Sequence, residues 1–277
     1  MNVTVTAVDD YVDDGTQVCT VVTGQAQSSD PNYNTNPADV TVSVTDNDTA
    51  GVTVVQPPTT TIYESGDPTF TTFTIRLNSQ PTSNVTIGLS TSNSQCGLSQ
   101  YSVTIPPEQW NTGASVAINA INDAIDDGNL ACTVRTANSV SSDDLYNDLP
   151  VADVTVTVVD DDTAGITVVP PAISSISEPD GSTSFTVRLN SEPTANVTID
   201  LTTSNTQCSA SPDPVVLTSA NWSGGVLVTV TAVNDAIDDG NLSCTVQTAN
   251  SVSSDDGYDD LPVADVTVTV VDDDTAG

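Results

Sequence analysis

The chain has 277 residues and carries 37 acidic side chains against three basic ones, with no histidine, which gives a formal net charge of −34. This charge excludes binding to nucleic-acid backbones and favours divalent cations, while the absence of histidine excludes Ser-His-Asp triads and His-ligated zinc. No run of residues is long and apolar enough to span a membrane, so membrane insertion is not expected either.

The main feature of the sequence is a repeated segment in which valine and threonine alternate and then give way to acidic residues. Residues 151–165 read Val-Ala-Asp-Val-Thr-Val-Thr-Val-Val-Asp-Asp-Asp-Thr-Ala-Gly, residues 263–277 repeat them, and residues 37–51 are a looser copy. Residues 122–165 and 234–277 differ at only four of 44 positions. The closing glycines Gly51, Gly165 and Gly277 therefore predict three units, residues 1–51, 52–165 and 166–277, of which the first is only the back half of a unit.

Residues 1–51 predict three strands, at residues 3–8, 18–22 and 40–44, where apolar and polar residues alternate. Three strands cannot close a sandwich, because the face that they bury needs a second sheet. We therefore expect the apolar face of this unit to be open, and to be completed by further chain or by a neighbouring protomer.

In each complete unit, short alternating stretches are separated by turns rich in Gly, Pro, Asn and Asp. The first strand expected in the first complete unit is residues 52–55, which is broken by Pro57 and Pro58 and resumes at residues 60–63. The other strands are residues 70–77, 85–89, 101–105, 114–121, 130–136 and 151–159, with Cys96 in a loop and Trp110 at one end of the core. Residues 166–277 follow the same order. About seven short strands without helical periodicity predict an all-β fold of tandem β-sandwiches.

The five cysteines follow the repeat. Cys96 and Cys132 are 36 residues apart, as are Cys208 and Cys244, and Cys19 corresponds to Cys132. We predict the disulfides Cys96–Cys132 and Cys208–Cys244, with Cys19 unpaired; the alternative is two buried free thiols per unit. Disulfides imply an oxidising compartment, so we expect an extracellular or cell-surface protein.

Acidic residues gather at three places in each complete unit: after the first strand, in the turn between the fifth and sixth strands, and in a triplet after the last strand. In a seven-strand sandwich these loops can lie at one end, where clustered carboxylates suit Ca²⁺. The predicted ligands are Glu64, Asp123, Asp126, Asp127, Asp160, Asp161, Asp162, Glu178, Asp235, Asp238, Asp239, Asp272, Asp273 and Asp274. The alternatives are solvated turns, which Asp and Asn favour for backbone reasons, and a general acidity adapted to salt.

Residues 228–240 read Val-Thr-Val-Thr-Ala-Val-Asn-Asp-Ala-Ile-Asp-Asp-Gly, and residues 264–274 read Ala-Asp-Val-Thr-Val-Thr-Val-Val-Asp-Asp-Asp. This combination resembles the Calx-β repeat, a family found in sodium–calcium exchangers, integrin β4 and large bacterial surface proteins. The resemblance covers both complete units and the fragment, and it implies seven-stranded immunoglobulin-like sandwiches.

In the calcium-binding members of the family, a glutamate after the first strand, the acidic turn and the terminal triplet hold calcium. The resemblance implies this role for Glu64, Asp123, Asp126 and the triplet at residues 160–162, and for their equivalents in the last unit. The sequence departs from the family in two places: Asn129 and Asn241 stand where an acidic residue is usual, and the first triplet, at residues 46–48, has Asn47 at its centre.

The short linker that follows each triplet predicts a bound ion at the joint between sandwiches, where charge neutralisation would stiffen the array into a rod. Glycans are a further expectation, because Asn-x-Ser/Thr sequons occur at Asn2, Asn47, Asn84, Asn196, Asn221 and Asn241.

We predict a structural protein, the module of an extracellular fibre or surface stalk, rather than an enzyme. Its expected partners are copies of itself or further repeats of the same chain, arranged head to tail. The alternative function is a calcium-dependent adhesin or recognition module of a large surface protein. Adjacent carboxylates such as Asp126 and Asp127 make a poor acid and base pair for a glycosidase.

Overall fold

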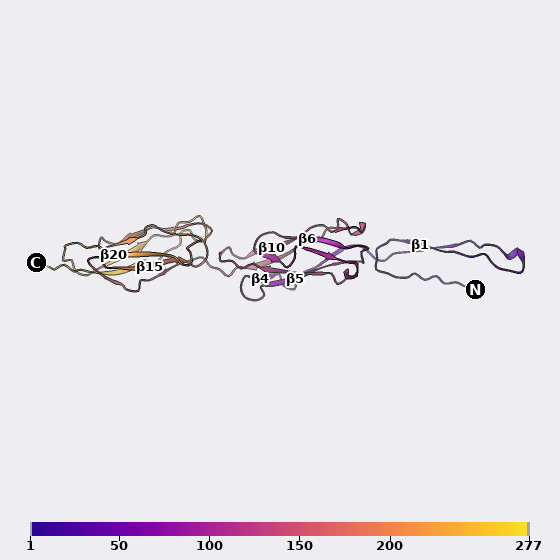
Figure 1. The fold of residues 1–277 in the computed structure, drawn as a ribbon, viewed down its shortest axis with the longest axis horizontal. Coiled ribbons are helices and arrows are strands. Elements are labelled where there is room, and N and C mark those ends of the chain that lie inside the picture. Colours follow the sequence, from indigo (N-terminus) through magenta and orange to yellow (C-terminus); the bar gives the residue numbers. More distant parts are fainter. Residues whose placement is uncertain (1, 276–277) are drawn as a thin grey trace. The chain divides into compact units, whose positions relative to one another are not determined.

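In the computed structural model, residues 2–275 are described, and they form an all-β chain (Figure 1). The chain divides into two compact units: Met1–Ile121 with Leu130–Val158, and Asn122–Asn129 with Val159–Gly277. The acidic turn at residues 122–129 thus belongs to the second unit. The predicted unit boundaries at Gly51 and Gly165 follow the sequence repeat instead, and they stay a prediction.

Among residues 2–275, no helix has the length and apolar character that a membrane crossing requires.

The first complete sandwich lies in the first unit and consists of two facing sheets. One sheet has the strand order β3-β5-β9-β7, and the other has β11-β6-β10-β12-β4 with β8 paired to β6. The elements are β3 (Val52–Val55), β4 (Thr61–Tyr63), β5 (Phe70–Leu77), β6 (Val85–Thr91), β7 (Cys96–Leu98), β8 (Ser102–Ile105), η2 (Pro107–Gln109), β9 (Ala114–Ala120), β10 (Leu130–Thr136), β11 (Val140–Ser141), η3 (Asp144–Tyr146) and β12 (Val154–Val159).

The core of this sandwich is made by the alternate residues of each strand, as a period of two requires. Phe73 and Ile118 come from one sheet, Ile87 and Val156 come from the other, and all four are at most 1% exposed. Trp110 is half-buried and packs against this cluster. The predicted alternation therefore corresponds to the division between core and surface.

The first strand of the sandwich changes sheets halfway along. β3 pairs with β5 in one sheet, whereas β4 pairs with β12 in the other. The two strands are separated by Pro57 and Pro58, which lack the N–H groups that would continue a ladder. This crossing places the residue after β4, Glu64, next to the end of the second sheet.

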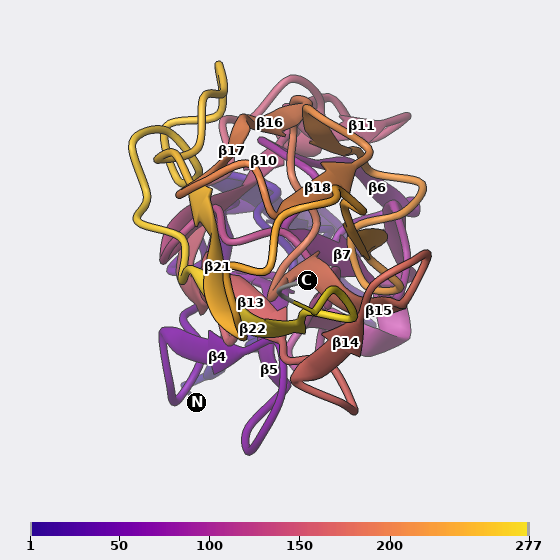
Figure 2. The same cartoon turned by 90° about the vertical axis from the view of Figure 1, so that its left-hand side faces the viewer.

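The second complete sandwich repeats this arrangement, with the sheets β13-β15-β20-β18 and β14-β22-β21-β17 and a β16-β19 pair. Several of its strands, among them β13, β21 and β22, are labelled in Figure 2. Its strands are β13 (Ile166–Val169), β14 (Ser175–Ser177), β15 (Ser182–Leu189), β16 (Val197–Ile199), β17 (Leu201–Thr203), β18 (Cys208–Ser211), β19 (Val215–Leu217), β20 (Val226–Ala232), β21 (Leu242–Thr248) and β22 (Val266–Val271).

The main difference between the sandwiches is that β6 corresponds to two strands, β16 and β17. In the first sandwich the Leu89 N–H donates to the backbone oxygen of Tyr101, over 2.9 Å. In the second the Leu201 N–H donates to the side chain of Asp213, over 2.8 Å. A carboxylate there replaces a backbone acceptor, so the regular ladder is interrupted between β16 and β17.

A buried tyrosine fixes a loop in each sandwich. The Tyr146 hydroxyl donates to the Ser79 carbonyl over 2.7 Å and accepts from the Ser79 N–H over 3.0 Å. Tyr258 makes the same bonds to Ser191, over 2.8 and 2.9 Å. Because a buried hydroxyl costs free energy unless it is hydrogen-bonded, these pairs tie distant parts of the chain together.

Each sandwich contains one disulfide that joins its two sheets. Cys96 of β7 is bonded to Cys132 of β10 with a Cα–Cα distance of 6.2 Å, and Cys208 of β18 is bonded to Cys244 of β21 with 6.1 Å. All four cysteines are at most 3% exposed. Cys96 begins a short strand, whereas the sequence predicted a loop, because β7 pairs with the edge of β9.

Residues 2–51 contain only β1 (Gln17–Val21), η1 (Pro31–Tyr33) and β2 (Val40–Val44). The strand predicted at residues 3–8 is not formed, so that prediction is wrong. The corresponding strand of the complete sandwich, β9, pairs with β5 and β7. Residues 2–51 include no counterpart of β5 or β7. Residues 3–8 therefore have no partner strand within residues 2–51. None of residues 2–50 is buried, as expected for an open face.

Candidate metal centre

Each acidic triplet begins with an aspartate that closes a turn through backbone hydrogen bonds. The Asp272 carboxylate accepts from the Gly240 N–H over 2.7 Å and from the Asp274 N–H over 2.8 Å. The Asn241 side chain accepts in turn from the Asp272 N–H over 3.3 Å. Gly240 has φ +73°, a conformation that glycine adopts readily. The acidic turn and the triplet therefore form one local unit.

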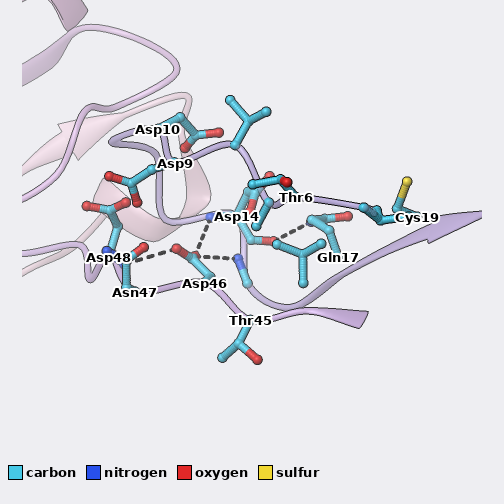
Figure 3. Close-up of a pocket in the computed structure, with 15 residues that line it drawn as sticks. Thr6, Asp9, Asp10, Asp14, Gln17, Cys19, Thr45, Asp46, Asn47 and Asp48 are labelled. Carbon is cyan, nitrogen blue, oxygen red and sulfur yellow. Dashed lines mark hydrogen bonds between the residues drawn. The ribbon is translucent and has the colours of Figure 1, made fainter. Parts of the chain in front are cut away.

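The same turn is present in the other two copies. Figure 3 shows it in residues 2–51, where Asp46 accepts from the Asp14 and Gly15 N–H groups over 2.9 and 2.8 Å. In the middle copy Asp160 accepts from the Gly128 and Asp162 N–H groups, over 2.7 and 2.8 Å. The turn therefore forms in residues 2–51 as well, although the sheet face there is open.

These hydrogen bonds keep the first acid of a triplet charged. The N–H groups of Asp274 and Gly240 lower the pKa of Asp272, and those of Asp48 and Gly15 lower the pKa of Asp46. Hydrogen bonds donated to a carboxylate stabilise its charged form. The first acid of each of these two triplets is thus anionic over a wide pH range.

The later acids of the last triplet lie beside the glutamate that follows β14. Oxygen atoms of Glu178, Asp273 and Asp274 all lie within 4.8 Å of one another. Glu178 is only 7% exposed, and its Oε2 is 3.5 Å from the Asp235 N–H. Three parts of the chain that are far apart in the sequence thus meet at one end of the second sandwich.

The proximity of these carboxylates opposes their ionisation. Burial raises the pKa of Glu178, and the negative charges of Asp235, Asp272 and Asp273 raise it further, against a hydrogen bond from the Asp235 N–H. Burial and the charges of neighbouring aspartates also raise the pKa of Asp274. Like charges at close range favour protonation or a bound cation.

One oxygen of this cluster has no partner among the described residues. Asp274 Oδ2 is buried and makes no hydrogen bond with any of them. A buried carboxylate oxygen without a donor is costly unless a cation approaches it. Ca²⁺ takes six to eight oxygen ligands at roughly 2.3–2.6 Å, so oxygens less than about 5 Å apart fit a single ion. Glu178, Asp273 and Asp274 are therefore chemically suited to hold calcium.

The other predicted acids of the last unit surround this cluster. Asp235 and Asp238 contribute to the raised pKa of Asp274. Asp239 accepts a hydrogen bond of 2.7 Å from the Gln207 side chain, while burial and the charge of Asp235 raise its pKa. These three acids therefore add negative electrostatic potential around Glu178, Asp273 and Asp274.

In the middle copy the turn and the triplet also come together. Asp126 accepts from the Ala164 N–H over 2.7 Å, and Asp123 accepts from the Ile125 N–H over 2.8 Å. Burial raises the pKa of Asp162, as do the charges of Asp161, Asp160, Asp123 and Asp126. Asp127 lies in the same turn. Within the first unit, Glu64 is 7% exposed at the end of β4.

The turn and triplet also bond to the sandwich that follows them in the sequence. Within the second unit, the Glu192 N–H donates to the Ala124 oxygen over 2.6 Å, and the Asn190 N–H donates to the Gly165 oxygen over 2.9 Å. A Cβ on Gly165 would lie 2.6 Å from the Asn190 side chain. A side chain on the glycine that closes the repeat would therefore require the Asn190 amide group to shift.

The first unit contains the corresponding contacts. The Gln80 N–H donates to the Tyr11 oxygen over 2.6 Å, and the Asn78 N–H donates to the Gly51 oxygen over 2.9 Å. The Tyr11 ring also lies 5.6 Å from the Trp110 ring, centroid to centroid. We call each set, residues 9–15 with 46–51 and residues 122–129 with 159–165, an acidic connector.

Sequence reasoning missed two residues that join an acidic turn to its triplet. Asn129 and Asn241, which stand where the Calx-β family usually has an acid, accept from the N–H of the first triplet aspartate, over 3.1 and 3.3 Å. Their position directly after the turn glycine is a signal that was available. An amide oxygen supplies the acceptor there without adding negative charge.

The sequons lie in different environments. Asn2, Asn47, Asn84, Asn196 and Asn241 are exposed. Asn221 is half-buried, and its side-chain amide donates to the Val216 oxygen over 3.2 Å. Glycosylation at these positions stays a prediction.

No family model matches the chain, and no curated protein matches it. Solved structures similar to it include the D0–D1 domain of intimin (16% identity over 79% of this chain and 96% of that one, TM-score 0.26). Others are CBD12 from CALX1.2 (14% identity, 71% and 79% covered, TM-score 0.29) and the Yersinia pseudotuberculosis adhesin InvE (16% identity, 80% and 60% covered, TM-score 0.30). At these TM-scores the likenesses support no statement about family or function. From its strand order and sheet pairing, the chain is an all-β protein with immunoglobulin-like β-sandwiches.

Proposed function

We propose that this chain is a structural module of an extracellular fibre or surface stalk, built from tandem Calx-β-type sandwiches that bind calcium. The observation that carries the proposal is the meeting of Glu178, Asp273 and Asp274 at one end of the second sandwich. These are three of the positions at which the Calx-β resemblance implies a calcium ligand.

The acidic connectors support a mechanical role for the ion. Their carboxylates are close enough to raise one another's pKa, and their backbones bond to the sandwich that follows in the sequence. Calcium would relieve the repulsion and hold each connector in its hydrogen-bonded form. The repetition of the connector fits a scaffold whose joints are alike.

The two inter-sheet disulfides support an extracellular location. Buried disulfides form and persist in oxidising compartments and are rare in the cytosol. The expected partners are further repeats of the same kind, arranged head to tail. Glycans at exposed positions such as Asn84 and Asn196, which occupy equivalent places in the two sandwiches, belong to the same proposal.

Calcium binding can be tested on the full chain by titration calorimetry and by thermal unfolding followed through Trp222, with Trp110 changed to Phe. Calcium should raise the unfolding temperature of the second sandwich. Glu178→Gln with Asp273→Asn should weaken binding there at least about 10-fold, since each lost carboxylate removes charge and a ligand. Asp256→Asn removes one charge from an exposed position and should leave binding unchanged. Equal binding by all variants would remove this site from the proposal.

The fibre role can be tested by electron microscopy of the native material in millimolar calcium and after chelation. Uniform filaments that loosen on chelation are the expected result. Filaments that are indifferent to chelation would contradict calcium as the stiffening agent. Isolated short rods in both conditions would contradict self-assembly and favour the adhesin or recognition module.

A further inference from the structure

Residues 2–51 present the sheet face of a half-sandwich. Their strands β1 and β2 have the register of the complete sandwiches: Cys19 is opposite Val42, just as Cys132 is opposite Val156 and Cys244 is opposite Val268. The sheet of β1 and β2 therefore has the same strand pairing as the complete sandwiches, although no second sheet covers it within residues 2–51.

The apolar residues of this segment show what is uncovered. Val3, which lies outside β1 and β2, is 78% exposed, whereas the corresponding Val116 of β9, in the facing sheet of the complete sandwich, is 0% exposed. Val40 is 53% exposed, whereas the corresponding Val154 of β12 is 0% exposed. In the complete sandwich the front-half strands β3 to β8 contribute the remaining strands around this core. In both complete sandwiches, therefore, the strands of the front half of the repeat cover the face that is exposed in residues 2–51.

Cys19 adds a chemical marker to the face. It is free and exposed, while the cysteines at the same register in β10 and β21 are bonded across the sandwich to β7 and β18. A hollow of about 380 Å³ has Cys19 in its lining, together with Val5, Val8 and Val44. Figure 3 shows Cys19 away from the acidic side chains Asp9, Asp10 and Asp48 of this hollow. The thiol is accessible from the open face.

We propose that residues 2–51 dock a front-half segment of another repeat, with the strand pattern and cysteine position of residues 52–113, and that Cys19 forms a disulfide with its cysteine. An intact second copy cannot supply this segment. In this chain Cys96 and Cys208 are already bonded within their own sandwiches, and their strands are already paired. The occupant is therefore a segment that has no back half of its own.

The covalent step requires a disulfide oxidant such as glutathione disulfide. The Cys19 thiolate attacks one sulfur of the oxidant and releases one thiolate, and the incoming cysteine thiolate then displaces the second. The two protein thiols lose two protons and two electrons in total, and the oxidant is reduced to two thiols. Docking by strand pairing comes first, because it brings the two thiols together.

The proposal deepens the head-to-tail partner of the proposed function, but it does not depend on calcium. The test mixes the full chain with a polypeptide of residues 52–113, prepared reduced, in a glutathione redox buffer containing a chelator. Non-reducing peptide mapping should find Cys19 linked to Cys96 of the added polypeptide. Amide exchange in residues 3–8 should slow on the order of 100-fold as they join the sheet.

Matched variants separate docking from the disulfide. A polypeptide with Cys96→Ser should still protect residues 3–8 but should not be linked, and one with Phe73→Asp and Ile75→Asp should do neither. Because the free polypeptide can aggregate, a second arm fuses residues 52–113 directly before Asn2 in the full chain. A Cys19 that remains alkylatable, with unprotected residues 3–8 in both arms, would overturn the proposal. Dimers of the full chain alone in which Cys19 is linked to Cys96 or Cys208 of the other copy would also overturn it, since an intact copy would then be the donor. Loss of calcium binding or of filaments would leave this result unchanged.

Discussion

Residues 2–51 and the complete sandwiches are the same repeat in two states, and they differ in which interactions are formed. The acidic connector is present in both, with the same hydrogen bonds from N–H groups to Asp46 and to Asp160. The covered sheet face is present only in the complete sandwiches. The strand that corresponds to residues 3–8, which is β9 in the first sandwich, is also formed only there. The acidic turn and the triplet form their hydrogen bonds with each other and do not require the front-half strands. A sheet face, in contrast, becomes buried only when those strands cover it.

The tyrosine of the repeat shows this difference in a single residue. Tyr33 and Tyr146 both end a short 3-10 helix whose preceding aspartate accepts a backbone hydrogen bond. Tyr146 is 1% exposed and is bonded to Ser79, but Tyr33 is 67% exposed. The local helix forms without the front half, and the distant hydrogen bond does not.

The largest expected effect concerns the disulfides. Changing Cys96 and Cys132 together to Ser should lower the free energy of unfolding of the first sandwich by roughly 3–4 kcal/mol, because the unfolded chain gains freedom. Urea unfolding can be followed through Trp110 with Trp222 changed to Phe. Cys19→Ser, in residues 2–51, should change the free energy of unfolding by less than about 0.5 kcal/mol. Similar effects of both changes would break the distinction between the two regions.

Core packing should give the next largest difference. Ile118→Ala removes a side chain that is 0% exposed, and it should cost about 3 kcal/mol through lost burial and a cavity. Val5→Ala, at the corresponding position of the fragment, should cost less than about 0.5 kcal/mol, because no cavity can form there. Urea unfolding monitored by circular dichroism measures both. A large effect of Val5→Ala would show that the fragment is covered in solution.

The tyrosine pair should show a smaller difference of the same kind. Tyr146→Phe leaves the buried Ser79 groups without their partner and should lower the free energy of unfolding by roughly 1–3 kcal/mol. Tyr33→Phe removes an exposed hydroxyl and should have no measurable effect. Thermal unfolding by scanning calorimetry compares the two. If Tyr146→Phe were as stable as the unchanged protein, water would have to replace the Tyr146 hydroxyl as the partner of Ser79.

The smallest effect is a pH dependence, which tests the acidic cluster of Glu178 and Asp274 at the end of the second sandwich. Burial raises the folded-state pKa of Glu178 and Asp274, so the folded protein binds these protons more tightly than the unfolded chain does. In the absence of metal, stability should therefore rise as the pH falls from neutral through these raised values toward the ordinary carboxyl range.

Further acidification should then reverse the gain. Backbone N–H groups lower the pKa of Asp272 and Asp46, so their contributions are present above the ordinary carboxyl range and are lost below it. Glu178→Gln should flatten the rise between neutral and mildly acidic pH, as measured by thermal unfolding at a series of pH values. A rise that is unchanged in this variant would assign it to other carboxyls.

Much of the fold could be predicted from the sequence, because alternation of Val, Ile and Thr reflects burial on one face. The strands expected at residues 70–77 and 130–136 have the observed bounds. The strand expected at residues 3–8 has the same pattern and does not form, since a pattern states which face would be buried but not whether a partner exists. The paired cysteines were found from repeat spacing, which carries information about two distant positions at once.

The candidate site was predictable as a set of acids but not in its division of roles. Asp272 directs its carboxylate to the N–H groups of its own turn, whereas Asp273 and Asp274 lie beside Glu178. Which aspartate of the triplet lies beside Glu178 depends on the turn conformation set by Gly240 and on Asn241. A sequence of three consecutive aspartates does not carry this information.

The inter-sheet disulfides have a consequence for a sandwich under tension. A chain pulled from its ends cannot extend the segment between two bonded cysteines, and that segment spans 36 residues in each sandwich. At roughly 3.4 Å per extended residue, each unfolded sandwich would lengthen by about 120 Å less than its reduced form. A fibre made of such units would yield in short steps, and reduction alone would make those steps longer.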